Sequence, residues 1–134
     1  MQPPSTNVVR LVVAASIVVT AFHFTDNAVS IDDYPQPDWI TEMVVFISWP
    51  LFSSVGVAGY LVYRDGKFPL ASWLLFAYAF AGISSLGHFL SGSPDEFTTR
   101  GVVSIFADGL AGVAVLTIAL WSFYSHRLTG GDAA

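Results

Sequence analysis

The chain has 134 residues, of which 54% are hydrophobic and only 11% carry a charge. Soluble domains contain about 25% charged residues, so we expect an integral membrane protein with lipid around it. The length suits a single domain. Cysteine is absent, which excludes disulfides and thiolate metal sites. The sequence has no basic patch and no glycine-rich phosphate loop, so nucleic acid is not an expected partner.

Four apolar stretches are long enough to cross the ~30 Å core of a bilayer, which takes about 20 helical residues. They lack the alternating polarity of membrane β-barrel strands. Because the connections are short, sequential helices should be antiparallel neighbours. The sequence therefore predicts an all-α fold, an up-and-down bundle of four transmembrane helices in one domain over residues 1–134. The predicted helices cover residues 7–30, 39–63, 69–91 and 100–126.

Two features of the second predicted helix carry specific expectations. Asp38 precedes the apolar run and is expected to cap the helix. Pro50 lies inside the run, and a proline there leaves the carbonyl of Phe46 without its helical hydrogen bond. We therefore expect the helix to bend near Pro50.

The basic residues gather at one end of this predicted bundle. Only Arg100 falls at the other end, which is otherwise acidic. The positive-inside rule makes the basic end cytoplasmic, so both termini of this multi-pass cell-membrane protein should be cytoplasmic. The residues of the basic end are Arg10, Arg64, Lys67 and Arg127. The acids at the opposite end are Asp26, Asp32, Asp33, Asp38, Glu42, Asp95 and Glu96.

The first predicted helix carries a polar stripe within its apolar sequence. Its members recur at spacings of four, three, four and three residues, which places them on one helix face. In lipid, a polar stripe faces other helices or a cavity, so we expect it to face the bundle interior, with the helix reaching at least Asn27. The stripe consists of Ser16, Thr20, His23, Asn27 and Ser30, with Asp26 beside His23.

The fourth predicted helix carries Asp108 deep in its apolar run, with the small residues Ala111 and Gly112 allowing a close helix approach. An unpaired aspartate at the centre of a membrane costs about 2.5–3.5 kcal/mol. A rise of about 1.5 Å per residue puts His23 and Asp108 at a similar depth. We therefore expect the two side chains to pair, directly or through one water.

The sequence thus predicts a polar site in the outer half of the bundle. Its candidate catalytic residues are His23 and Asp108, because a carboxylate can orient an imidazole for acid–base work. The candidate metal ligands are His23, His88, Asp108 and Asp26, a set that suits a divalent transition metal. His23 and His88 are also candidates to hold a haem iron from opposite faces. The candidate ligand-binding residues are Thr20, Asn27, Glu42, Trp49, Ser84 and Ser85.

Three functions follow from this prediction. The first is a site for a metal, a cofactor or a small lipophilic ligand, with catalysis left open. The second is a proton-coupled transporter in which His23 and Asp108 exchange protons; it requires a homo-oligomer, because four helices rarely enclose a full pathway. The third is an accessory subunit of a larger membrane complex. Simpler interpretations also remain: Glu42 as a first-turn charge, His88 as a rim residue, and the His23–Asp108 pair as a purely structural contact.

Overall fold

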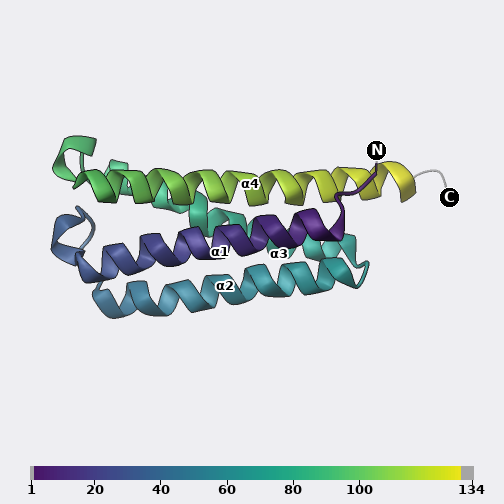
Figure 1. The fold of residues 1–134 in the computed structure, drawn as a ribbon, viewed down its shortest axis with the longest axis horizontal. Coiled ribbons are helices and arrows are strands. Elements are labelled where there is room, and N and C mark those ends of the chain that lie inside the picture. Colours follow the sequence, from purple (N-terminus) through teal and green to yellow (C-terminus); the bar gives the residue numbers. More distant parts are fainter. Residues whose placement is uncertain (1, 131–134) are drawn as a thin grey trace.

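The computed structural model describes residues 2–130, and its regular elements over that range are all helical. Four long helices run up and down the bundle, each antiparallel to the next (Figure 1). The elements in chain order are α1 (Thr6–Val29), η1 (Ile31–Asp33), α2 (Glu42–Arg64), α3 (Phe68–Ser84), η2 (Ser85–Leu90), η3 (Pro94–Glu96) and α4 (Thr99–Gly130). The elements labelled η are short 3₁₀ helices.

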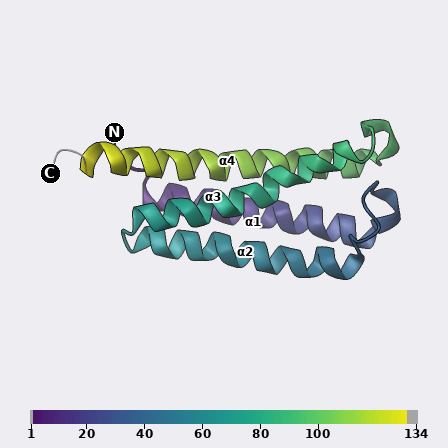
Figure 2. The same cartoon turned by 180° about the vertical axis from the view of Figure 1, so that it is seen from behind.

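The long helices form a ring in chain order. α1 packs against α2 and α4, and α3 packs against the same two helices from the other side (Figures 1 and 2). Four helical segments of the described chain are long and apolar enough to span a membrane: Thr6–Val29, Glu42–Arg64, Phe68–Leu90 and Thr99–Arg127. The predicted all-α class and the four predicted segments are therefore confirmed.

Two predicted boundaries were wrong in detail. Residues 37–40 form a turn closed by the Ile40 N–H and the Pro37 carbonyl, so α2 starts later than expected. Its cap is Thr41 rather than Asp38, because the Thr41 hydroxyl accepts a hydrogen bond from the Val44 N–H at 3.4 Å. The third segment is α-helical only to Ser84 and continues as the 3₁₀ helix η2.

The two ends of the bundle differ in charge. We call the end formed by residues 30–41 and 91–98 the acidic end, because it carries Asp32, Asp33 and Asp95. The opposite end, the basic end, holds the described parts of both termini and the turn at residues 65–67 (Figure 1). There the hydroxyl of Tyr63 donates to the carbonyl of Pro4 and ties the N-terminal segment to α2.

A close contact between α3 and α4 sets the register of the site. A Cβ atom added to Gly112 would lie 2.6 Å from the backbone nitrogen of Ile83, and one added to Gly82 would lie 2.9 Å from the carbonyl oxygen of Asp108. Only glycine allows the two backbones to come this near. The close approach expected at Gly112 is confirmed, and it brings the start of η2 beside Asp108.

Candidate functional site

The polar stripe of α1 faces the interior of the bundle. Ser16, Thr20, His23 and Asn27 are all at most 4% exposed. The helix continues to Val29, beyond the last of them. Both expectations are confirmed for these four residues, which lead from the middle of the bundle toward its acidic end. Ser30, the fifth residue of the predicted stripe, lies past the end of α1 as its C-cap and is half-buried.

Asp108 of α4 lies at the deeper end of this polar region and is fully buried. The hydroxyl of Thr20 donates to its Oδ1 at 2.7 Å, and the hydroxyl of Ser85 donates to its Oδ2 at 2.5 Å. Each oxygen of the carboxyl group thus has a partner from a different element. Asp108 therefore links α1, η2 and α4 inside an apolar bundle.

His23 contacts α4 one helical turn away from Asp108. Its Nδ1 lies 3.2 Å from the hydroxyl oxygen of Ser104. His23 and Asp108 were expected to pair directly or through one water. Among the described residues, the hydrogen bonds of Asp108 go to Thr20 and Ser85, so the direct form of that pairing is not made. The helical rise per residue predicted a similar depth for His23 and Asp108. In the structure, α1 is shifted along α4, so that Thr20 lies beside Asp108 and His23 lies beside Ser104.

A chain of polar contacts continues from Ser104 to the acidic end. Its hydroxyl oxygen lies 3.1 Å from that of Tyr34, and the Tyr34 hydroxyl donates to Oδ2 of Asp26 at 2.7 Å. The Oδ1 of Asp26 pairs with Nε of Arg100 at 2.5 Å. Burial raises the pKa of Tyr34 above its ordinary value, so its hydroxyl keeps its proton at neutral pH. Asp26 is therefore part of an ion pair rather than a free metal ligand.

Sequence reasoning left Tyr34 and Ser104 out of the site. In the sequence, Tyr34 is typical of an aromatic residue at a membrane interface. In the structure, residues 30–41 fold back over the bundle and bury Tyr34, which is 3% exposed. Ser104 had an available signal: it precedes Asp108 by four residues and so shares its helix face.

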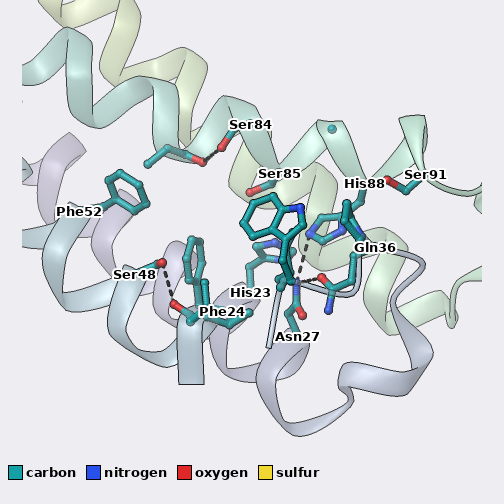
Figure 3. A pocket seen from close by; sticks show the side chains of 17 residues that line it. His23, Phe24, Asn27, Gln36, Ser48, Phe52, Ser84, Ser85, His88 and Ser91 are labelled. Atoms are coloured by element: carbon teal, nitrogen blue, oxygen red, sulfur yellow. Dashed lines mark hydrogen bonds between the residues drawn. The ribbon is translucent and has the colours of Figure 1, made fainter. Parts of the chain in front are cut away.

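A pocket of about 490 Å³ lies beside this chain, between α1, α2, η2 and the α1–α2 connection at the acidic end (Figure 3). Much of its wall is aliphatic or aromatic, and four of its polar side chains, His23, His88, Asn27 and Gln36, lie against one another. The lining residues from α1 and the connection are His23, Phe24, Asn27, Gln36, Pro37, Trp39 and Ile40. Those from α2 are Val44, Val45, Ser48 and Phe52, and those from α3, η2 and the next residue are Ala81, Ser84, Ser85, Gly87, His88 and Ser91.

Two amide side chains of this wall are incompletely hydrogen-bonded. The Nδ2 of Asn27 lies 3.1 Å from Nε2 of His88 and donates to Oε1 of Gln36 at 3.4 Å, as drawn in Figure 3. Asn27 Oδ1 and Gln36 Nε2 are buried and have no hydrogen-bond partner within the described residues. Turning both amides over exchanges the atoms involved, but one donor and one acceptor still lack partners.

The ligand-binding candidates separate into two groups. Asn27, Ser84 and Ser85 line the pocket. The other three are not among the residues that line the pocket. Thr20 is bound to Asp108. The Nε1 of Trp49 donates to the carbonyl of Ile17 at 3.4 Å, between α2 and α1. Glu42 is exposed on the first turn of α2 and agrees with the simpler interpretation of a first-turn charge.

The arrangement does not fit the metal and haem expectations. No group of three or more His, Asp or Glu side chains in the described chain is placed to hold a metal ion. Asp108 is occupied by hydroxyls and Asp26 by Arg100 and Tyr34, so these acids do not join His23 and His88 in one ligand set. The two imidazole rings pack edge to face, with 5.5 Å between centroids, which leaves no room for a porphyrin between them.

Comparison of the chain with known protein families, with curated proteins and with solved structures finds no match. The class of this protein is therefore described from its fold and its candidate site. It is a four-helix bundle of membrane-spanning dimensions, with a buried polar chain that runs beside a pocket near one end.

Proposed function

We propose that this protein is a multi-pass membrane protein that binds a small lipophilic ligand with a polar head group in the pocket near its acidic end. Four helices of sufficient length and apolar character support membrane insertion. The basic residues at the end that holds the termini support a cytoplasmic position for that end. The pocket would then open in the outer half of the membrane.

The observation that carries the proposal is the composition of the pocket. Ligand pockets typically measure about 300–1,000 Å³ and combine an apolar wall with a few converging polar groups. This pocket has a volume of about 490 Å³, and His23, His88, Asn27 and Gln36 converge in its wall. Each unsatisfied buried amide atom costs about 1–3 kcal/mol. A ligand head group that bonds to Asn27 and Gln36 would remove that cost.

The entrance is expected between the start of α2 and η2. On one side, Trp39 is 71% exposed and Val44 is 40% exposed. On the other side, the lining residues Ser84 and Ser91 are exposed. These surfaces would face the outer leaflet, so an amphipathic molecule could enter from lipid with its head near the membrane interface.

The proposal is tested by a bulky side chain introduced into the pocket, with the same substitution outside the pocket on the same helix as the control. Ser48 lines the pocket, whereas Ser54, also on α2, is exposed and is not a lining residue. We expect native mass spectrometry of protein purified in mild detergent to show a bound small amphiphile in the wild type and in Ser54→Trp, but not in Ser48→Trp. Equal occupancy in both variants, or none in the wild type, would contradict the proposal.

Two other functions remain proposals with different outcomes. A proton-coupled transporter requires a homo-oligomer, and an accessory subunit requires a partner in a larger membrane complex. Mass measurement of the same detergent-solubilised protein separates these cases, since the ligand-binding function is complete in a monomer. A stable oligomer would favour the transporter.

A further inference from the structure

A continuous series of polar side chains connects the pocket to the surface of the acidic end. His23 lines the pocket, and its Nδ1 is 3.2 Å from the Ser104 hydroxyl. The next separations are 3.1 Å from Ser104 to Tyr34, 2.7 Å from Tyr34 to Asp26, and 2.5 Å from Asp26 to Arg100. The Arg100 side chain is 57% exposed. The first four members are buried and the fifth is exposed, so the series runs from the pocket to the protein surface.

The hydrogen atoms in this series are assigned from the partners of each group. Asp26, paired with Arg100, only accepts hydrogen bonds, so Tyr34 must donate its single hydroxyl hydrogen to it. Ser104 then has its one hydrogen for two acceptors, the Tyr34 oxygen and the Gly101 carbonyl. With that hydrogen used, the Nδ1 of His23 must carry a proton and donate it to Ser104. The Nε2 of His23 is left as an acceptor on the pocket side.

We infer that His23 accepts a proton from a weakly acidic hydroxyl group of the bound ligand and passes one on through Ser104 and Tyr34 to Asp26. This inference rests on the proposed ligand-binding function and specifies the ligand as a lipophilic phenol. A phenolic hydroxyl can give its proton to imidazole. Its ring suits a pocket lined by Phe24, Phe52 and Trp39.

The proton transfer balances without any further reactant except water. The ligand O–H bond breaks and an Nε2–H bond forms on His23, while the Nδ1 proton moves to Ser104. The Ser104 hydroxyl hydrogen moves to Tyr34, and the Tyr34 hydroxyl hydrogen moves to Asp26. Water beside the exposed Arg100 then takes the proton from Asp26. The net change is a bound phenolate and one proton released at the acidic end, with every side chain returned to its starting charge.

Ionisable groups surround His23 from several elements, and they bear on the stability of the phenolate. His88 of η2 and Tyr34 of the connection contact its ring, with centroids 5.5 Å and 6.0 Å away. The other titratable and charged groups of this region are Asp26 on α1 and Arg100 and Asp108 on α4. Asp108 accepts hydrogen bonds from Thr20 and Ser85, neither of which belongs to the series. The amide of Asn27 or Gln36 supplies an N–H for the phenolate oxygen in either amide orientation.

The test uses 2-octyl-4-nitrophenol, whose phenol and phenolate forms differ in visible absorbance, with purified full-length protein in mild detergent. Saturable quenching of tryptophan fluorescence measures binding. A laser-induced pH jump then measures the rate at which the bound phenol loses its proton. The variants are Tyr34→Phe and Ser104→Ala, which each remove one hydroxyl outside the pocket lining. The control is Tyr124→Phe, the same chemical change at an exposed position near the basic end.

We expect the Tyr124→Phe control to bind the probe as tightly as the wild type, and both relay variants to retain saturable binding. Proton loss should become about 100-fold slower in Tyr34→Phe and in Ser104→Ala, and it should be unchanged in Tyr124→Phe. A purely structural role for Tyr34 predicts an unchanged or faster rate, because loosening the acidic end admits water. That result, with binding intact, would overturn the relay and leave the proposed ligand site standing. Absence of saturable binding in the wild type would overturn the phenol class and the relay together.

Discussion

Asp26 and Asp108 are both buried carboxyl groups, but their neighbours satisfy them in different ways. Asp26 lies near the acidic end, where Arg100 neutralises it and Tyr34 adds a hydrogen bond. Asp108 lies deeper, and two hydroxyl groups rather than a cation surround it. An aspartate at such depth is tolerated only when its oxygens have partners, so Asp108 should contribute to the stability of the bundle.

Removal of the Asp108 carboxyl group should destabilise the protein in a graded manner. Asp108→Asn keeps one acceptor oxygen, whereas Asp108→Ala leaves the Thr20 and Ser85 hydroxyls without this partner. Each unsatisfied group costs about 1–3 kcal/mol, so we expect Ala to lower the free energy of unfolding more than Asn. Denaturation of the detergent-solubilised protein measures both. The exposed Asp32→Ala serves as the control, and an unchanged Asp108→Ala would contradict this role.

At the scale of elements, the contact between α3 and α4 depends on glycine. The space at Gly112 is bounded by backbone atoms of α3, including the Ala79 carbonyl oxygen 2.8 Å from where a Cβ would lie. Backbone cannot move aside as a flexible side chain can. A methyl group here must push the helices apart, and with them Ser85 and Asp108.

Gly112→Ala should therefore destabilise the bundle by about 1–3 kcal/mol, the usual cost of overpacking a core. Gly87→Ala is the matched control, because a Cβ at Gly87 meets nothing within 4 Å. Thermal unfolding followed by circular dichroism compares the two variants. If both variants unfold at the wild-type temperature, the close packing of α3 on α4 does not limit stability.

The bend expected in α2 also belongs to this scale. α2 is a continuous helix from Glu42 to Arg64 with Pro50 inside it, and the pocket residues Ser48 and Phe52 flank that proline. Pro50→Ala restores the hydrogen bond to the Phe46 carbonyl, so the helix should straighten. Spin labels at Met43 and Arg64 should then lie farther apart. An unchanged distance would mean that Pro50 does not bend the helix.

At the scale of the whole molecule, the orientation in the membrane is the central prediction. The basic end should face the cytoplasm and the acidic end the outside. Because the chain has no cysteine, single cysteines report without background. We expect Asp33→Cys and Ser93→Cys to react with an impermeant thiol reagent in intact cells, while Asp65→Cys reacts only after lysis. The reverse pattern would invert the topology.

The number of helices and the inward face of α1 could be predicted from the amino-acid sequence. Apolar length sets how many segments can cross a membrane. Helical periodicity determines which residues share a face, so Thr20, His23 and Asn27 were recognisable as interior residues before any partner was known. The charge difference between the two ends was likewise readable from the chain. These properties depend on each segment alone.

Which side chains contact one another depends on how the helices pack together. The pairing of Thr20 with Asp108, and of His23 with Ser104, depends on how far α1 is shifted along α4. Such a shift is set by packing between helices, and no periodicity within one helix contains it. Tyr34 and Gln36 enter the site because the α1–α2 connection folds back over the acidic end. Irregular segments lack a repeating pattern, so this path, and the pocket it closes, could not be predicted from the sequence.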